Sequence, residues 1–325
     1  MVFHCQKRVE NRPTLYDLHS SCYTTPIHMS KKQIVIIGQG QIGKAIKHLL
    51  KKTKHDVSIE CWDVDVKTCP RRKPLDKIVP EADILFLCVP SWAIRAAAQD
   101  LGHLIKKTTT LVSLSKGLDR SSTKTVDELL KEVFPNVKKI ALMSGPMLAE
   151  EIVQNMPAAA VVASTSTQAQ KELTELFKPT KLHAMPAKDL RGTAICGILK
   201  NIYSMGFGMA QSMHPGDNFR GMYMNATINE MEQIIHRLGG DKTTVCSFAG
   251  IGDLVATGFS KHSKNHEYGK QLAEKGKVDF DSEGSVSIRP MAKKIGALHK
   301  KLPILYTIYQ IVAEGKPAKN ILNVF

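Results

Sequence analysis

Residues 33–50 read QIVIIGQGQIGKAIKHLL and carry the strongest structural signal in the chain. The β-branched residues at 34–37 are typical of a central strand in a parallel sheet. The glycine pattern Gly38-x-Gly40-x-x-Gly43 follows at once, and apolar residues then recur at helical spacing. Strand, tight turn and helix thus come in the order that predicts a dinucleotide-binding unit.

Each glycine of this pattern has its own expected role. Gly38 permits the tight turn, Gly40 lets the backbone approach a pyrophosphate, and Gly43 lets the helix pack closely on the strand. The unpaired N–H groups at the helix start, around Gln41 and Ile42, are expected to face the phosphates. The pattern therefore indicates a nicotinamide or flavin cofactor.

A carboxylate is expected at the adenosine end of this cofactor. Residues 57–63 predict a second strand that ends in Asp63, 20 residues after Gly43. A carboxylate there can hydrogen-bond the ribose hydroxyls and repels a 2′-phosphate, so Asp63 favours NAD, with NADP still possible. Asp65 competes for the role, and a loop carboxylate without a ligand is the plain alternative.

Composition is that of a two-domain enzyme. The 325 residues exceed a usual single core, 43% of them are hydrophobic, and no apolar run is long enough to span a membrane. Seven cysteines lack paired metal spacing, so we expect no metal site, reduced thiols and a cytoplasmic location. The net charge of +15 comes without an aromatic-basic module, which favours an anionic cofactor and substrate over nucleic acid.

Three segments are expected along the chain. Residues 1–30 lack periodicity and are interpreted as a flexible extension, with Met29 as an alternative start. Residues 31–186 alternate strands and helices, which predicts a Rossmann-type, doubly wound, mostly parallel sheet. Residues 187–325 predict an all-helical domain for substrate binding and catalysis. The expected strands are 34–37, 57–63, 84–89, 110–114, 140–143 and 158–163, and the expected helices include 91–101, 121–134 and 222–238.

Two polar clusters interrupt apolar surroundings in the second half. Lys200 and Asn201 lie within a helical pattern between Leu199 and Ile202. A lysine in this setting can lose its water, which lowers its pKa toward the range of proton exchange with an alcohol. The alternative is a lysine that extends out of an amphipathic helix into solvent. The second cluster is 252–257, GDLVAT, continued by residues 263–265, SKN.

The order of motifs from residue 33 to the C-terminus resembles the NAD(P)-dependent glycerol-3-phosphate dehydrogenases. The resemblance implies reversible hydride transfer between NAD(P)H and dihydroxyacetone phosphate, giving sn-glycerol 3-phosphate for glycerophospholipid synthesis. It also implies an active site between the two domains. Because members of the family are often dimeric, it implies a possible homodimer as well. The motifs that carry it are IVIIGQGQIG (34–43), LCVPSWAIR (87–95), LSKGLD (114–119), SGPMLAEE (144–151), GILKNIYSMGFGMA (197–210), GDNFRGMYMNATINEM (216–231), FAGIGDLVAT (248–257), SKNHEYG (263–269) and SEG (282–284).

Position by position, the resemblance also implies catalytic roles. Lys200 corresponds to the general acid/base that gives a proton to the carbonyl oxygen during reduction. Lys116 corresponds to a substrate and cofactor contact that steadies developing negative charge. Asn201, Asp253 and Thr257 correspond to hydrogen-bonding groups around the lysine and the substrate hydroxyls, and Asp253 is expected to hold the Lys200 ammonium.

Further ligand contacts are implied in the same way. The segment Ser263-Lys264-Asn265 corresponds to the part that closes over the substrate phosphate. For Thr257, Ala149 and Glu283 a purely structural role is the open alternative. The implied cofactor contacts outside the glycine turn are Asp63, Pro90, Lys116, Ala149, Lys264 and Glu283, and the implied substrate contacts are Lys116, Gly145, Lys200, Asp253, Ser263, Lys264 and Asn265.

Departures from the family pattern leave the substrate open. Lys264 stands where the family generally has arginine, and an ammonium cannot grip phosphate with two parallel hydrogen bonds. Met147 replaces a small hydroxyl residue, Ala194 replaces an acid, and the stretch 63–82 is short. The alternatives are a sister dehydrogenase acting on another small keto acid or phosphorylated ketone, and a nucleotide-binding homologue without catalysis.

Overall fold

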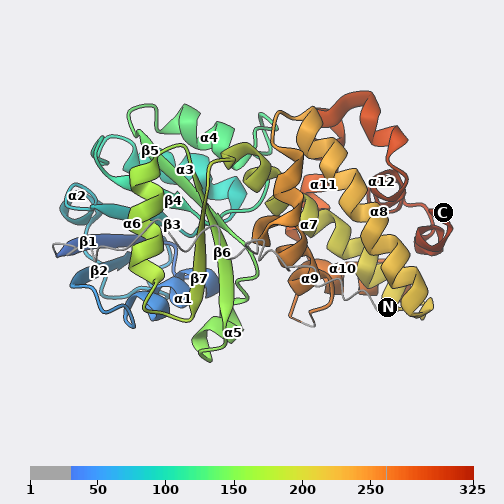
Figure 1. Cartoon of the computed structure of the whole chain (residues 1–325), viewed down its shortest axis with the longest axis horizontal. Helices are drawn as coiled ribbons and strands as arrows, with labels where there is room; N and C mark the ends of the chain where they lie inside the picture. The colour runs from blue at the N-terminus through green and yellow to red at the C-terminus, as the bar shows by residue number, and fades with distance from the viewer. Residues whose placement is uncertain (1–30, 261) are drawn as a thin grey trace, which may run out of the picture.

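The computed structural model of the chain describes residues 31–260 and 262–325. The expected extension at 1–30, with Met29, lies outside these described residues. A sheet flanked by helices forms one half of the molecule and a bundle of helices forms the other (Figure 1). No helix in the described ranges is both long and apolar enough to cross a lipid bilayer.

The first half is built on one seven-stranded sheet with the order β2-β1-β3-β4-β5-β6-β7. All neighbouring strands are parallel except β5 and β6, so the expected mostly parallel sheet is confirmed, with one antiparallel junction. Residue Ile36 of β1 pairs with Cys61 on one side and Phe86 on the other. The strands are β1 (Lys32–Ile37), β2 (Val57–Trp62), β3 (Ile84–Leu87), β4 (Thr110–Ser113), β5 (Lys139–Ser144), β6 (Ala158–Ser164) and β7 (Leu182–Ala187).

Alternating side chains of the strands feed two hydrophobic cores. Ile34 and Ile36 pack in a core with residues of α1 (Gln41–Leu50) and α6 (Thr167–Phe177). Val35 and Ile37 face the opposite way, toward α3 (Ile94–Leu101) and α4 (Val126–Val133). The sheet is therefore covered on both faces, as the fully apolar strands require. The short helices α2 (Leu75–Ile78) and α5 (Ala149–Val153) complete this half.

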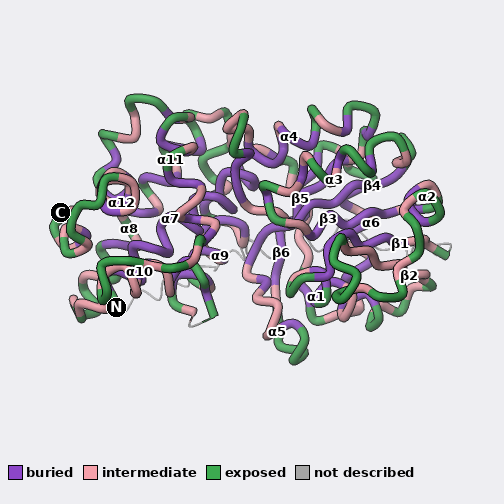
Figure 2. Tube along the Cα trace, turned by 180° about the vertical axis from the view of Figure 1, so that it is seen from behind, coloured by how far each residue is buried: buried purple, intermediate pink, exposed green. Residues whose placement is uncertain are grey.

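The second half is arranged around one buried helix. The chain leaves the sheet at the end of β7 and enters α7 (Leu190–Gln211), where nearly every residue is buried (Figure 2). Such a helix, buried on all sides, is stable only inside a bundle. The surrounding helices are α8 (Gly216–Arg237), α9 (Asp253–Gly258), α10 (Lys264–Lys275), α11 (Glu283–Ile295) and α12 (Pro303–Glu314).

Several expected helix boundaries were wrong. The helix expected from residue 121 begins at Val126, because Ser121 and Ser122 instead donate hydrogen bonds to Asp119 and hold a turn. The helix expected at 91–101 is a 3₁₀ turn (Ser91–Ala93) followed by α3. The helix expected at 222–238 starts earlier, at the beginning of α8.

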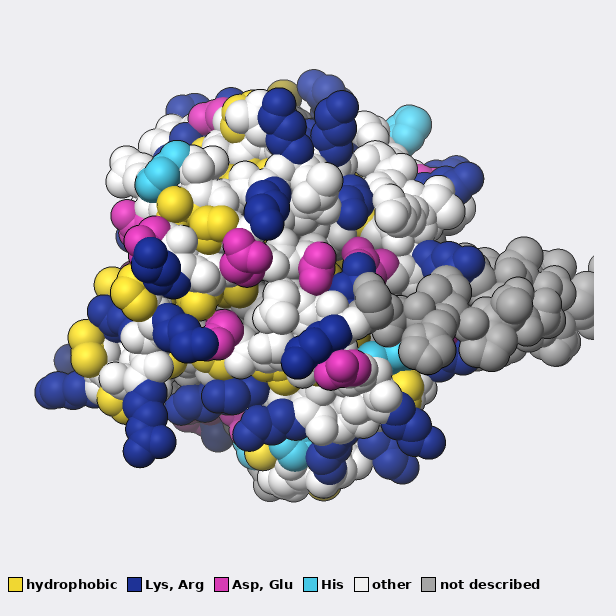
Figure 3. Space-filling view, turned by 90° about the vertical axis from the view of Figure 1, so that its left-hand side faces the viewer, with side chains coloured by type: hydrophobic (Ala, Val, Ile, Leu, Met, Phe, Trp, Pro, Cys, Tyr) yellow, Lys and Arg dark blue, Asp and Glu magenta, His cyan; other side chains and the backbone are white. Residues whose placement is uncertain are grey.

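Charged side chains of both signs cover the outer end of the sheet half. Figure 3 looks onto the end of the molecule formed by the sheet half, and its Lys and Arg side chains are spread over this face with Asp and Glu among them. No group of His, Cys, Asp or Glu able to hold a metal ion occurs in the described part of the chain. On this face the positive side chains therefore do not gather into a single patch that would attract anions.

Candidate active site

The glycine turn leaves room for a phosphate-bearing ligand. A Cβ on Gly38, whose φ is +93°, would stand 2.6 Å from the Cys88 carbonyl oxygen, and one on Gly43 would stand 1.9 Å from the Gly38 carbonyl oxygen. At Gly40 a Cβ would meet nothing within 4 Å. The outer two glycines are thus required by packing, whereas Gly40 borders open space at the start of α1, where N–H groups favour an anion. This geometry fits a dinucleotide pyrophosphate.

Asp63 lies directly against the glycine turn. Its Oδ2 accepts a hydrogen bond from the Gln39 N–H at 2.6 Å, and its Oδ1 accepts one from the Asp65 N–H at 2.9 Å. The competing carboxylate of Asp65 points elsewhere, because it accepts hydrogen bonds from Thr68 and from the Lys67 N–H. The geometry supports Asp63 as the ribose contact.

A cation that the sequence analysis missed lies beside Asp63. The guanidinium of Arg72 is 5.0 Å from the ring centre of Trp62 and donates hydrogen bonds to the carbonyl oxygens of Asp63 and Val64. The guanidinium thus makes a cation–π contact with Trp62, and an arginine near the ribose acid can accommodate a 2′-phosphate. Arg72 follows Asp63 by nine residues, within the stretch 63–82 that is short relative to the family, and this shortening did not by itself indicate an arginine.

Two lysines from different halves of the molecule meet at one carboxylate. Asp253 Oδ2 lies 2.6 Å from Lys116 Nζ, and Asp253 Oδ1 lies 3.4 Å from Lys200 Nζ. Lys200 also donates to Thr257 Oγ1 at 2.8 Å, and the Thr257 hydroxyl lies 3.2 Å from Asp253 Oδ1. Asp253 and Thr257 are 3% exposed and Lys200 is 8% exposed, so the cluster is largely dry.

Burial sets the protonation of this cluster. Desolvation lowers the pKa of Lys200 to about 8, with the positive charge of Lys116 acting in the same direction and Asp253 opposing it. Burial alone would raise the pKa of Asp253, yet the ammonium groups of Lys116 and Lys200 overcome it and hold that pKa below its usual value. Asp253 therefore stays ionised, and Lys200 exchanges its proton near neutral pH.

A chain of amide contacts joins Lys116 to α11. Asn201 Nδ2 donates to the Lys116 carbonyl oxygen at 3.2 Å, and Asn265 Nδ2 donates to Asn201 Oδ1 at 2.9 Å. The Gly284 N–H, in the first turn of α11, donates to Asn265 Oδ1 at 2.8 Å. Asn201 and Asn265 are 3% and 8% exposed, so these bonds are shielded from water.

Local sequence explains why these groups meet. A Cβ on Gly197 would stand 3.2 Å from Lys116 Cγ, and one on Gly284 would stand 2.4 Å from the Asn201 carbonyl oxygen. Both glycines thus permit close approach of a partner to helix backbone. Asp253 follows a π-helical turn, Phe248–Gly252, a distortion that is frequent at functional sites.

Glu283 joins the two halves at another point. Its Oε2 accepts a hydrogen bond from Ser91 Oγ at 3.3 Å, and a Cβ on Gly117 would lie 2.7 Å from the same oxygen. Burial raises the pKa of Glu283 to about 7, although the hydrogen bond from Ser91 and the charge of Lys200 oppose this shift. Ser91 lies within the motif LCVPSWAIR (87–95) but was not expected at the site from the sequence.

The remaining sequence-predicted residues surround the cluster unevenly. The Gly145 carbonyl oxygen accepts a hydrogen bond from Lys116 Nζ at 3.3 Å. Ser263 caps α10 by accepting from the His266 N–H. Lys264 is exposed, and no hydrogen bond or ion pair joins it to the cluster within the described residues. Of the others, Pro90 and Gln41 are exposed, Ile42 and Ala149 are half-buried, and Met147 and Ala194 are buried.

Comparisons with known proteins match both halves of the chain. The family model described as NAD-dependent glycerol-3-phosphate dehydrogenase N-terminus matches residues 67–170, and the model for the C-terminus matches residues 189–323. The glycerol-3-phosphate dehydrogenase (NAD(P)+) of Thermoanaerobacter sp. (strain X514) is 30% identical over 311 residues, which cover 87% of this chain and 93% of the relative. The protein of the same name from Clostridium tetani is 28% identical, with 90% and 91% covered.

Solved structures share the fold. The glycerol-3-phosphate dehydrogenase of Coxiella burnetii has a TM-score of 0.78 and 24% identity, and covers 90% of this chain and 98% of that structure. The corresponding structure from Plasmodium falciparum has a TM-score of 0.80 and 16% identity, with 91% and 95% covered. Taken with the family models and the 30% identical relative, these matches show that the chain belongs to the NAD-dependent glycerol-3-phosphate dehydrogenase family and is an NAD(P)-dependent oxidoreductase.

Proposed function

We propose that this chain catalyses the reversible reduction of dihydroxyacetone phosphate to sn-glycerol 3-phosphate. The observation that carries the proposal is the carboxylate of Asp253, shared by Lys116 and Lys200 in a nearly dry cluster. Two ammonium groups and one carboxylate leave a net positive charge, which favours a phosphorylated substrate. The resemblance and the relatives' names supply the particular ketone.

The residues of the cluster divide the chemistry between them. The nicotinamide, when bound, supplies or accepts the hydride. Lys200, with its pKa lowered to about 8, gives a proton to the carbonyl oxygen during reduction and takes it back during oxidation. Lys116 holds the negative charge that develops on that oxygen, and Asp253 fixes the two ammonium groups relative to each other.

The groups around the lysines orient the substrate in this proposal. Thr257 accepts the hydrogen bond from Lys200 and thereby aims its proton, while Asn201 holds the Lys116 backbone. Asn265, Ser263 and Lys264 lie at the start of α10, where free N–H groups suit a phosphate. Gly38, Gly40 and Gly43 with Asp63 hold the cofactor, and Glu283 reaches it from α11.

Further parts of the proposal concern the whole protein. We take residues 31–186 as the nucleotide domain and 187–325 as the catalytic domain, with the boundary in the step from β7 to α7. We propose a homodimer in the cytoplasm whose product enters glycerophospholipid synthesis. Cys61, Cys69, Cys88, Cys196 and Cys246 are free thiols, which agrees with a reducing compartment. Sedimentation of the purified protein tests the dimer.

Two structural observations favour a second substrate class. Met147, only 8% exposed, fills space beside Gly145, and Lys264 has no contact with the cluster in the described residues. A sister dehydrogenase for another small keto acid or phosphorylated ketone would fit a site altered at these two points. If the first proposal holds, Lys264→Arg lowers the KM for dihydroxyacetone phosphate, because guanidinium grips phosphate better than ammonium.

One assay separates these possibilities. Purified protein is mixed with NADH or NADPH and with dihydroxyacetone phosphate or a panel of small keto acids, and absorbance at the nicotinamide band is followed. The proposal expects oxidation with dihydroxyacetone phosphate, and Lys200→Ala lowers it by about 10²–10⁴-fold with NADH affinity nearly unchanged. Turnover only with another carbonyl compound would favour the sister dehydrogenase, and binding without turnover would favour the non-catalytic homologue.

A further inference from the structure

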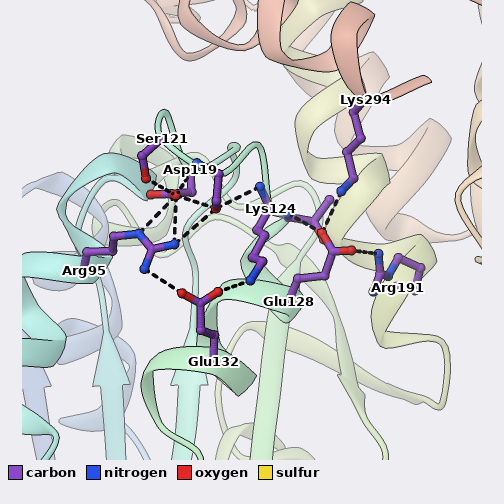
Figure 4. A network of polar contacts seen from close by, with 10 residues as sticks. Arg95, Asp119, Ser121, Lys124, Glu128, Glu132, Arg191 and Lys294 are labelled. Carbon is purple, nitrogen blue, oxygen red and sulfur yellow. Dashed lines mark hydrogen bonds and ion pairs between the residues drawn. The ribbon is translucent and has the colours of Figure 1, made fainter. Parts of the chain in front are cut away.

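A single carboxylate joins the two halves of the molecule. We call the half with the sheet, residues 31–186, the nucleotide half, and the helical half, residues 187–325, the catalytic half. The carboxylate lies in the nucleotide half and binds two helices of the catalytic half. Glu128, on α4, accepts from Arg191 Nη1 of α7 at 2.6 Å with one oxygen. Its other oxygen accepts from Lys294 Nζ of α11 at 2.8 Å (Figure 4). The three side chains are between 15% and 26% exposed, so the contacts are partly shielded from solvent.

The two ties differ in how far they depend on Glu128. Arg191 keeps a second acidic partner, because its Nε lies 2.9 Å from Asp127 Oδ2 and the Asp127 side chain is 1% exposed. Lys294 has Glu128 as its only carboxylate partner among the described residues. Loss of the Glu128 charge therefore leaves α7 attached through Asp127 but removes the ion pair that joins the C-terminal end of α11 to the nucleotide half.

Helix α11 is held against the nucleotide half at both of its ends. Lys294 contacts Glu128 near the C-terminal end, and Glu283 contacts Ser91 at the N-terminal end. The two residues are eleven positions apart, about 16 Å along a helix axis. The two contacts lie on one continuous helix, which contains Pro290 between them, so a shift at one end can reach the other.

The N-terminal end of α11 leads directly to the lysine cluster. Gly284 donates to Asn265, Asn265 to Asn201, and Asn201 to the backbone of Lys116, in bonds of 2.8, 2.9 and 3.2 Å. Gly284 also lies so close to the Asn201 carbonyl that a Cβ there would stand 2.4 Å from it. Any shift of α11 therefore displaces the amides that hold Lys116.

We propose that Glu128 is a positioning residue for the reaction: by holding Lys294 it seats α11 and so sets the place of Lys116 relative to Lys200. This inference rests on the proposed function, because it assigns the two lysines to one reaction. A displacement of about 1 Å at reacting groups is enough to cost a large part of the rate. Glu128 itself touches neither substrate nor cofactor.

The tie stays intact over the working pH range. Burial opposes ionisation of Glu128, but the hydrogen bonds from Lys294, the Thr125 N–H and Arg191 lower its pKa to about 2. Glutamine at this position keeps the size of the side chain and, with its amide oxygen in the place of Oε2, the hydrogen bond from the Thr125 N–H, which caps α4. Lys294 then faces a neutral oxygen instead of a carboxylate, and Arg191 faces an amide N–H. Glu128→Gln thus removes the charge and leaves the helix start in place.

Glu132 provides a matched control. Glu132 lies on the same face of α4 as Glu128, one turn further along the helix. It binds Arg95 and Lys124, and all three residues belong to the nucleotide half. Glu132→Gln therefore removes the same charge from the same network without loosening a contact between the halves. The test compares Glu128→Gln, Lys294→Met, their double variant, Lys294→Arg and Glu132→Gln.

Two readouts decide the proposal. In hydrogen exchange of the ligand-free protein, Glu128→Gln and Lys294→Met are expected to raise exchange at residues 284–287 about tenfold, whereas Glu132→Gln leaves it unchanged. In steady-state kinetics, the first two lower kcat/KM for dihydroxyacetone phosphate about tenfold while the Kd for NADH stays within about twofold. The double variant is no worse than either single one, and Lys294→Arg retains most of the activity.

The opposite outcomes would overturn it. If Glu128→Gln matches Glu132→Gln in both readouts, or if the effects of Glu128→Gln and Lys294→Met multiply, Glu128 does not act through Lys294 and α11. Failure of the proposed function is separate: the wild-type protein would then not oxidise NADH with dihydroxyacetone phosphate. The exchange measurement would still decide whether Glu128 seats α11.

Discussion

Lys116 Nζ lies 2.6 Å from Asp253 Oδ2, although 137 residues separate the two along the chain. Lys116 comes from the loop after β4 in the nucleotide half, and Asp253 begins α9 in the catalytic half. The contact therefore forms only when both halves have folded and met. It gives the site a charge arrangement that neither half has alone.

Removal of the shared carboxylate should disable the site. Asp253→Asn leaves the ammonium groups of Lys116 and Lys200 close together without a counter-charge, which favours loss of the Lys200 proton. We expect kcat/KM for reduction to fall about 10²–10³-fold while NADH affinity changes little. Steady-state kinetics and NADH fluorescence titration measure both, with the exposed Asp217→Asn as control. Equal losses in the two variants would refute the role.

The pH profile should depend on direction. Lys200 has a pKa lowered to about 8, so reduction needs its protonated form and loses rate as the pH rises through 8. Oxidation needs the neutral form and gains rate over the same interval. For reduction, we expect kcat/KM to fall about tenfold per pH unit above the pKa of Lys200. For oxidation, we expect kcat/KM to fall about tenfold per pH unit below that pKa. Parallel profiles in both directions would place the exchanging proton on another group.

Cofactor choice should respond to Asp63. Asp63→Asn removes the charge that opposes a 2′-phosphate, while Arg72 remains beside it as a cation. We expect the affinity for 2′,5′-ADP to rise about tenfold relative to that for 5′-ADP, measured by calorimetry. Asp65→Asn is the matched control, because its carboxylate faces Thr68 and Lys67. An effect at Asp65 instead would reassign the ribose contact.

Glu283 should make stability fall as the pH rises. Its pKa is raised to about 7 in the folded protein, so the folded state binds a proton more tightly than the unfolded chain. Its contribution therefore decreases between the ordinary glutamate pKa and 7, and above 7 the buried carboxylate is ionised at a constant cost in stability. Glu283→Gln should raise the free energy of unfolding at pH 8 by about 2–3 kcal/mol and leave it nearly unchanged at pH 4. Denaturant unfolding of the ligand-free protein measures this, and no gain at pH 8 would contradict it.

Much of the fold was predictable because the strands of the nucleotide half are buried on both faces. Continuous apolar runs such as residues 84–87 have no other stable setting in a soluble domain, and the glycine turn fixed the first strand, turn and helix. The burial of Lys200 was only one of the two outcomes that its apolar neighbours allowed, because a lysine can also extend out of an amphipathic helix into solvent. The antiparallel junction between β5 and β6 had no such signal, because pairing direction leaves no local pattern.

The ties between the halves were not predictable. Glu128 and Lys294 are 166 residues apart, and each lies in a charged stretch that reads as an ordinary solvated helix face. Only the folded arrangement, in which α4 and α11 both contact α7, makes them partners. The helix expected from residue 121 began too early for a related reason. Serine is a common residue at a helix start, but Ser121 here donates a hydrogen bond to Asp119, which also accepts one from Arg95.

The two bare glycines at the boundary have a consequence for how such a protein can change over time. Gly197 of the catalytic half accommodates Lys116 of the nucleotide half, and Gly117 of the nucleotide half accommodates Glu283 of the catalytic half. Each half thus has a glycine whose missing side chain leaves a space, here called a vacancy, and a side chain of the other half fills that space. Recombination that exchanged one half with a distant relative would succeed only if both vacancies were inherited together, so the two halves evolve as a matched pair rather than as interchangeable modules.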